Sequence, residues 1–145
     1  MRVIGLAVLI GVALLLCVVV VIGGISWPQG YELPDGLKGW VVIRYEIPSC
    51  PPMRNAGLFR VVVVNASGNG CTSESRGKRW TYHRYEYVRP DGSRLSLHAT
   101  GWGGRGNVWG YSGSVYHSDG RVDHRYVFFV GTEDEFRRGT SNPPR

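Results

Sequence analysis

The pattern of apolar and polar positions divides the chain into one long apolar segment and a longer region of alternating residues. Residues 3–25 hold no charged side chain, and only Arg2 and the amino terminus precede them. A helix of this length covers roughly 34 Å, enough to cross a hydrocarbon core of about 30 Å. The apolar region of a cleaved signal peptide has only about 7–15 residues. Residues 1–26 therefore predict a transmembrane anchor.

Two other fates of this segment stay open. Gly24 and Ser26 are small residues at the spacing that signal cleavage requires, and cleavage there would release a secreted or periplasmic protein. Lipidation at Cys17 would need a small residue beside the cysteine, but residues 14–16 are all leucine. The sequence therefore favours the anchor over cleavage and disfavours lipidation.

The charges around the apolar segment set its orientation. Arg2 keeps the amino terminus inside, and no basic residue follows before Lys38. The sequence therefore predicts a single-pass protein of the cell membrane with its remaining part outside the cytoplasm. That location makes nucleic acid an unsuitable partner.

Residues 27–38 are rich in proline and glycine and read as a stalk and a turn. A β-rich domain is expected from 39 to 139, followed by a disordered tail at 140–145. Strand-length runs of β-branched and aromatic residues fall at 39–47, 58–64, 79–88, 94–100, 108–117 and 122–130. The predicted fold is mainly β, either an antiparallel β-sandwich or a strongly twisted sheet.

Local signals define two hairpins and a helix. Residues 89–93 (RPDGS) are turn chemistry, and the hairpin they make sets Glu86 opposite Ser96 and Arg84 opposite His98. Thr132 and Glu135 have the spacing of a capping box, which predicts a short helix to about residue 138.

The second hairpin is expected to turn at Asp119-Gly120. Centring it there sets His117 opposite Val122 and places Trp109 and Tyr111 on the same apolar face as His124. His117 and His124 could begin a zinc site, but no third ligand is evident, so no metal is assigned and the pair is interpreted as partly buried.

Charge and cysteine content indicate which partners the surface permits and whether a disulfide forms. Beyond Arg2 the chain has 16 of its 17 Lys and Arg against 11 Asp and Glu, and the basic residues are scattered. Such a surface permits weak attraction to anionic lipid or an envelope glycan but is usually only solvated. Cys50 and Cys71 are the two cysteines outside the apolar segment, and an oxidising compartment predicts a disulfide between them.

A glycine-rich loop supplies the candidate binding residues. Trp102, Arg105, Trp109 and Tyr111 lie in or beside the glycines at 101–106. Aromatic rings next to an arginine can form a platform for a glycan or a peptide. The alternative is that the rings pack the sheet while the glycines make a wide turn, and the composition favours this alternative.

The search for catalytic groups finds ingredients without a recognisable constellation. Glu86, Ser96 and His98 would share one face of the first hairpin. A carboxylate, a hydroxyl and an imidazole together could perform acid–base chemistry, but they are also typical of an ordinary solvated sheet face. No nucleophile elbow and no phosphate loop occur, so no catalytic residue and no cofactor are assigned. Asn65-Ala66-Ser67 fits both a glycosylation acceptor and a turn.

Three stretches resemble a bacterial family, the DUF6843 domain-containing proteins. They are residues 33–43 (LPDGLKGWVVI), the strand and turn from Pro51 to Ser73, and residues 128–136 (FFVGTEDEF), the most specific of the three. The resemblance implies an exported or lipid-anchored protein with a β-rich domain. It brings no activity and no functional residue, and Cys50 and Cys71 depart from the family pattern.

Together these observations predict a membrane-tethered extracytoplasmic β-domain that acts as a binding or envelope-interaction module, with an envelope glycan or protein as its partner. The alternative is a secreted hydrolase or metal-dependent enzyme that uses His and Glu residues of the sheet. A purely structural accessory of the envelope is a third reading.

Overall fold

A computed structural model describes residues 27–77, 81–100, 106–116, 118–120 and 122–139, with only the backbone at 111–113 and 116. The predicted anchor at 1–26 and the predicted tail at 140–145 lie outside the described residues. Within the described ranges, no helix is both long and apolar enough to cross a membrane.

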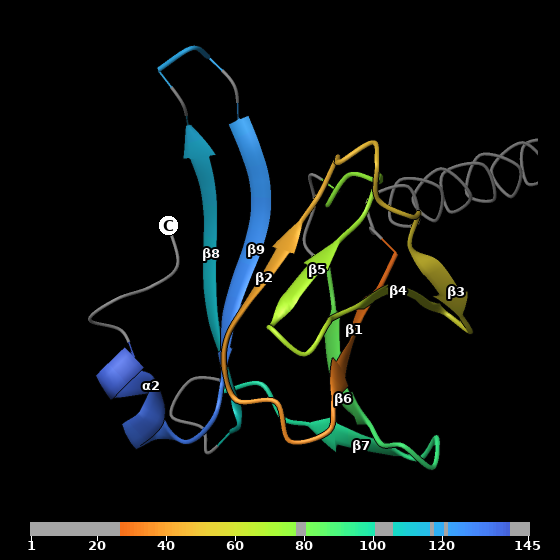
Figure 1. Cartoon of the computed structure of the whole chain (residues 1–145), viewed down its shortest axis with the longest axis vertical. Coiled ribbons are helices and arrows are strands. Elements are labelled where there is room, and N and C mark those ends of the chain that lie inside the picture. Colours follow the sequence, from red (N-terminus) through yellow and green to blue (C-terminus); the bar gives the residue numbers. More distant parts are fainter. Residues whose placement is uncertain (1–26, 78–80, 101–105, 117, 121, 140–145) are drawn as a thin grey trace, which may run out of the picture.

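The described chain forms two β-sheets and one short helix (Figure 1). The five-stranded sheet has the order β3-β4-β1-β6-β7, with β3 at Arg54–Ala56, β4 at Phe59–Val63, β1 at Gln29–Pro34, β6 at His83–Val88 and β7 at Arg94–Leu97. The four-stranded sheet has the order β5-β2-β9-β8, with β5 at Asn69–Cys71, β2 at Gly39–Arg44, β9 at Val122–Val130 and β8 at Val108–Tyr116. Helix α2 spans Glu133–Gly139.

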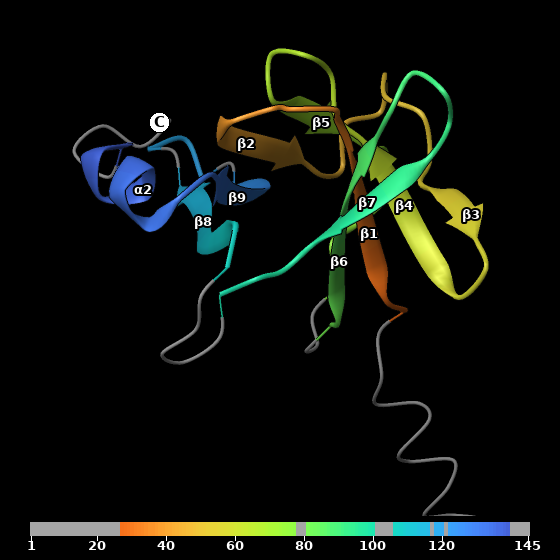
Figure 2. The same ribbon diagram turned by 90° about the horizontal axis from the view of Figure 1, so that it is seen from below.

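The prediction of a mainly β domain is confirmed, but the expectation of antiparallel sheets is wrong in part. β1 runs parallel to both of its neighbours, β4 and β6, and β2 runs parallel to β5. β1 and β2 follow each other in sequence yet belong to different sheets, so their neighbours are reached by crossovers between layers (Figure 2). The hairpins and the β2–β9 pair are antiparallel.

The assignment of residues 27–38 to a stalk is also wrong for β1, which is the central strand of the five-stranded sheet. Tyr31 and Leu33 point to the core and are 1% exposed. Gln29 and Glu32 are buried as well, and each has polar partners: Gln29 accepts hydrogen bonds from Tyr31 and Tyr45, and Glu32 accepts one from Arg94. A prediction based on hydrophobicity missed this strand because it contains polar residues that are buried together with their hydrogen-bond partners.

The core lies between the two sheets and consists of side chains from both. It contains alternate residues of β1 and β2 and the inward face of β9, with Tyr31 stacked near Tyr85, Tyr126 and Phe128. Such apolar area is the main stabilising contribution in a domain of this size. Helix α2 covers the outer face of the four-stranded sheet, where Phe136 contacts Trp40 and Phe129.

The register of the β8–β9 hairpin differs from the predicted one by a single residue. Tyr116 pairs with Val122, and Ser114 pairs with His124, so the described pairing ends at residues 116 and 122. A slip of one residue moves every side chain of one strand to the opposite face. Trp109 consequently lies opposite Phe129 on the outer face, away from the core face of Tyr126 and Phe128.

Several local predictions are confirmed. Glu86 pairs with Ser96, and the Arg89 amide donates to the Ser93 carbonyl across the turn. The ladder ends at Leu97, so Arg84 and His98 are not paired in it. The Thr132 hydroxyl accepts the Glu135 amide, the Glu135 carboxylate accepts the Thr132 amide, and Cys50 and Cys71 form a disulfide.

Candidate functional site

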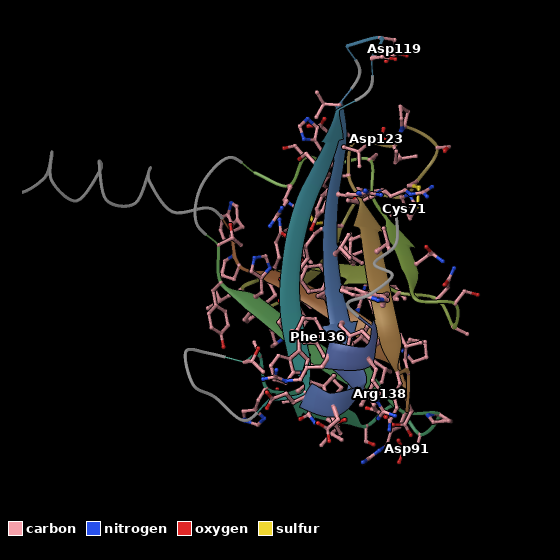
Figure 3. All side chains as sticks on the ribbon, turned by 90° about the vertical axis from the view of Figure 1, so that its left-hand side faces the viewer. Cys71, Asp91, Asp119, Asp123, Phe136 and Arg138 are labelled. Atoms are coloured by element: carbon pink, nitrogen blue, oxygen red, sulfur yellow. A yellow bond between two sulfur atoms is a disulfide. The ribbon has the colours of Figure 1, made fainter. Side chains whose placement is uncertain are left out.

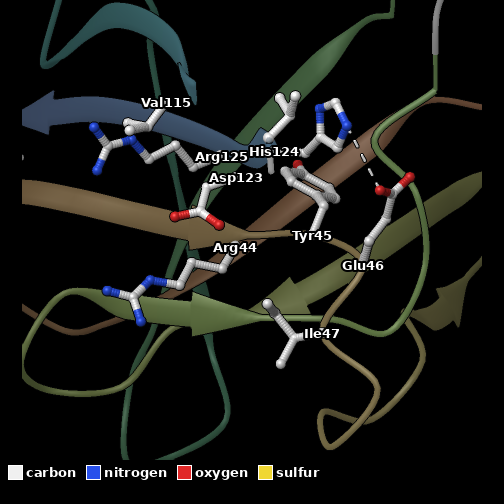
Figure 4. Close-up of a pocket in the computed structure, with 9 residues that line it drawn as sticks. Arg44, Tyr45, Glu46, Ile47, Val115, Asp123, His124 and Arg125 are labelled. Carbon is white, nitrogen blue, oxygen red and sulfur yellow. Dashed lines mark ion pairs between the residues drawn. The ribbon is translucent and has the colours of Figure 1, made fainter. Parts of the chain in front are cut away.

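A pocket of about 370 Å³ lies where β2 ends beside the β8–β9 hairpin. It is near the end of the molecule that carries Asp123 and Cys71, opposite the end with Asp91 and Arg138 (Figure 3). Its lining comes from the end of β2 and the residues after it, and from both strands of the hairpin: Arg44, Tyr45, Glu46, Ile47, Val115, Val122, Asp123, His124 and Arg125 (Figure 4).

Two arginines form one side of this pocket. Arg44 and Arg125 are directly opposite each other in the β2–β9 ladder, so their side chains leave the same face of the sheet. Like charges in this position repel. The Nε atom of Arg125 is buried and has no hydrogen-bond partner among the described residues. Asp123 leaves the same face two residues before Arg125, which leaves this side with a surplus of positive charge (Figure 4).

The other side of the pocket holds an acid–imidazole pair. The Glu46 carboxylate lies 3.6 Å from His124 Nε2, and both side chains are about half exposed, at 50% and 46%. Glu46 has a φ of 59°, in the left-handed region that a residue with a side chain rarely adopts. Its amide donates to the Glu74 carbonyl at 3.0 Å, which holds the strained residue in place. Backbone strain of this kind concentrates at functional sites.

Tyr45 connects the pocket to a polar cluster between the sheets. Its hydroxyl lies 3.0 Å from the Tyr31 hydroxyl and donates to Gln29 Oε1 at 3.0 Å. The Tyr31 hydroxyl also lies 3.1 Å from His83 Nδ1. Nearby, the hydroxyls of Tyr85 and Tyr126 are 2.6 Å apart. The cluster therefore consists of hydrogen-bonded groups from both sheets.

Burial keeps this cluster uncharged near neutral pH. Desolvation raises the pKa of Tyr45 to about 12 and raises the pKa of Tyr31 and of Tyr85 well above the ordinary value for tyrosine. Burial, and then the positive charge of Arg76, lowers the pKa of His83 to about 4. Because the groups are neutral and mutually hydrogen-bonded, they hold the two sheets together, and Tyr45 is the member of the cluster that also lines the pocket.

The structure places the residues of the predicted binding loop in different settings. Trp109 is partly buried: its ring stacks on Phe136 at 5.0 Å, and its Nε1 donates to the Gly131 carbonyl at 3.1 Å. It packs helix α2 against the sheet, as the packing alternative for this residue expected. Trp102, Arg105 and the side chain of Tyr111 lie outside the described residues, so their role in binding stays a prediction.

The structure describes only some of the candidate metal and acid–base residues. His124 pairs with Glu46, while His117 lies outside the described residues. In the part of the chain that is described, no group of three or more His, Cys, Asp or Glu could hold a metal ion. Glu86 is bound to Arg84 and Arg94 on the outer face of the five-stranded sheet.

Reasoning from the sequence missed the pocket and the polar cluster for the same reason. Both depend on which strands meet across the two sheets, and the topology was not predicted. One signal was available: Tyr31 and Tyr85 each lie within alternating strand patterns, and a buried tyrosine hydroxyl normally requires a partner. The arginine pair could be found only from the correct β2–β9 register.

Asn65 forms the turn that its sequence predicted. Its side-chain oxygen accepts the amides of Ser67 and Asn69 at 3.0 Å. Asn65 is exposed. Glycosylation of this residue stays a prediction.

Comparison with known proteins extends this description to the fold and the family. One similar solved structure is a 2.75 Å crystal structure described as a "Putative Lipoprotein from Bacillus anthracis". It has a TM-score of 0.61 at 19% identity and covers 82% of this chain and 80% of its own, which shows a shared fold. No curated protein matches the chain. The model of DUF6843, a family of unknown function, matches residues 27–137, and the chain belongs to that family.

Proposed function

We propose that this protein is a membrane-tethered extracytoplasmic binding module and that the pocket beside β2 takes a small anionic ligand, a carboxylate or a phosphate. The observation that carries the proposal is the pairing of Arg44 and Arg125 at the pocket, with the buried Arg125 Nε lacking a partner among the described residues.

The energetics of the arginine pair favour an anion. Two guanidinium groups that leave adjacent strands on one face repel each other, and a ligand oxygen placed between them would remove that repulsion. A buried donor without a partner is costly, and a charged ligand would satisfy it. Guanidinium groups suit carboxylates and phosphates because they bind two oxygens at once. Asp123 and Glu46 also line the pocket, so the ligand must reach the two arginines while its negative charge avoids both carboxylates.

Tethering is the second part of the proposal. It is supported by the uncharged apolar residues 3–25. The similar fold of a protein described as a lipoprotein adds support for an envelope location by another kind of attachment. Cys17 remains the alternative attachment point. Alkaline washing of membranes from cells that express the full chain should leave it in the membrane fraction, and release by the wash would contradict a spanning anchor.

A thermal shift assay on the full chain in detergent would test the ligand, with inorganic phosphate and citrate as probes. At constant ionic strength both probes should raise the melting temperature relative to chloride. Arg44→Gln and Arg125→Gln should abolish that rise. Arg89→Gln removes the same charge from a turn at the other end of the fold and should preserve it. The proposal fails if neither probe stabilises the wild-type chain, or if both pocket variants respond as the wild type does.

The Glu46–His124 pair supports a second candidate, the hydrolase alternative. A carboxylate that orients an imidazole beside an open pocket is a common arrangement for a general base. The test is hydrolysis of 4-nitrophenyl acetate and 4-nitrophenyl phosphate by the full chain. Activity that His124→Asn and Glu46→Gln both abolish would support it. A rate equal to that of the buffer, or equal rates in the variants and the wild type, would remove it.

A further inference from the structure

Large apolar side chains are exposed at one end of the five-stranded sheet, where the strands β1, β4 and β6 begin. Trp27 is 66% exposed, Leu58 is 73% exposed and Tyr82 is 58% exposed. Trp27 precedes β1, Leu58 precedes β4 and Tyr82 precedes β6. These three residues, with the partly exposed Phe59, are called the strand-start rim below.

The parallel pairing of β1 brings the rim residues to one level. Gln29 is aligned with both Arg60 and His83, so the residues that precede these three lie side by side at the same end of the sheet. The Arg60 amide donates to the Pro28 carbonyl, and the Gln29 amide donates to the Tyr82 carbonyl, both at 2.9 Å. The rings of Phe59 and Tyr82 are 6.1 Å apart, on either side of β1.

Gly30 and Arg84 complete the surface around the rim. Gly30 carries no side chain next to Phe59: a Cβ there would lie 3.8 Å from Phe59 Cβ and 3.0 Å from Val61 Cγ2. The Arg84 guanidinium lies over the Phe59 ring, 3.9 Å from its centroid. Exposed tryptophan and tyrosine beside an arginine are typical of protein surfaces at the membrane–water interface. Amphipathic rings lie at the level of the lipid headgroups there, and a cationic side chain can bind lipid phosphate.

The position of the apolar segment identifies what covers the rim. Only Ser26 separates residue 25, the end of the apolar segment, from Trp27. Two residues of extended chain span at most about 7 Å, and each headgroup layer of a bilayer is roughly 5–8 Å thick. If residues 3–25 span the bilayer, Trp27 lies in the headgroup layer, and the other rim residues lie at the same level.

We propose that the strand-start rim seats in the headgroup layer of the membrane and sets the orientation of the domain, with β1, β4 and β6 running away from the bilayer. The inference rests on the proposed tethering. It also places the pocket at the membrane end of the domain. Tyr45, which lines the pocket, donates a hydrogen bond to Gln29, the first residue of β1.

Spin labels on the full chain in liposomes would test the seating. In a Cys17→Ala background, single labels at Leu58→Cys, Val63→Cys and Leu95→Cys all occupy exposed positions. Val63 lies five residues after Leu58, roughly 16 Å farther along β4, and Leu95 pairs with Tyr87 at a similar height. The ratio of oxygen accessibility to nickel-complex accessibility should be several-fold higher at Leu58 than at the two control sites.

Flotation of the same samples separates the two proposals. Protein that fails to float with the liposomes contradicts the tethering. Protein that floats but gives equal ratios at all three sites overturns the seating alone.

Quenching of native tryptophan by brominated lipid gives a second readout without a label in the domain. Trp27→Phe should reduce the quenched fraction. Trp40→Phe, which alters the ring packed against α2 on the other sheet, should leave that fraction unchanged. Equal quenching in the Trp27→Phe variant and the wild type would also overturn the seating.

Discussion

The hydroxyl groups of Tyr31 and Tyr45 lie 3.0 Å apart and join the two sheets of the domain. Tyr31 belongs to the central strand of the five-stranded sheet, while Tyr45 follows β2 in the four-stranded sheet. Both share Gln29 Oε1 as an acceptor, so the contact is a closed group of three hydrogen-bonded side chains. Buried polar groups that satisfy one another in this way specify how two layers meet.

Tyr31→Phe should therefore destabilise the domain although it adds no volume. The substitution removes the hydroxyl that contacts Gln29, Tyr45 and His83, and it leaves His83 Nδ1 without that partner. The expected loss in the free energy of unfolding is about 1–3 kcal/mol. Urea unfolding of the full chain in detergent measures it. Tyr82→Phe removes an exposed hydroxyl and should change stability by less than about 0.5 kcal/mol; equal losses would contradict the role of the cluster.

His83 should make stability depend on pH. Burial and Arg76 lower its pKa from 6.5 to about 4, so the folded state holds it neutral while the unfolded state takes up a proton below 6.5. This contribution is fully present above pH 6.5 and is lost as the pH falls toward 4. Unfolding curves between pH 6.5 and 5 should show the decline, and His83→Gln should flatten it. Tyr82→Phe should retain the wild-type slope; an unchanged slope in His83→Gln would contradict the prediction.

Glu32 should contribute more to stability than an exposed ion pair does. Its carboxylate is 8% exposed and accepts hydrogen bonds from Arg54 and, at 2.6 Å, from Arg94. Glu32→Gln keeps the shape and removes the charge, and the expected loss in the free energy of unfolding is about 1.5–3 kcal/mol. Glu133→Gln breaks an exposed pair with Arg137 and should lower the free energy of unfolding far less than Glu32→Gln does. Equal losses in urea unfolding would place Glu32 among ordinary surface charges.

Local chemistry was predictable wherever neighbouring residues determine it. The RPDGS turn, the capping box of Thr132 and Glu135, and the Cys50–Cys71 disulfide all follow from residue type and spacing, and the structure contains each of them. The cysteines could be paired without knowledge of the fold because only two lie outside the apolar segment.

Features that depend on contacts between distant strands were not predictable in the same way. β1 is polar at Gln29 and Glu32, and its burial is favourable because residues distant in sequence, Tyr45 and Arg94 among them, form hydrogen bonds with these side chains. The β8–β9 register was wrong by one residue because the pairing ends at Tyr116 and Val122, which leaves five residues between the strands where the prediction had four. Because of that slip, Trp109 was predicted on the face of Tyr126 and Phe128 and lies on the opposite face, where it packs on α2.

The disulfide yields a prediction for the full chain that also reports on its compartment. Cys50 and Cys71 are bonded, whereas Cys17 lies in the apolar segment. Chain that has been exported, purified without reductant and then denatured should therefore show one reactive thiol, which rises to three after reduction. Cys50→Ser together with Cys71→Ser opens a loop between residues 21 apart and should destabilise the domain by about 3 kcal/mol. Cys17→Ala should abolish the single thiol of the unreduced chain without altering unfolding. Three thiols before reduction would show that the bond does not form in the exported protein.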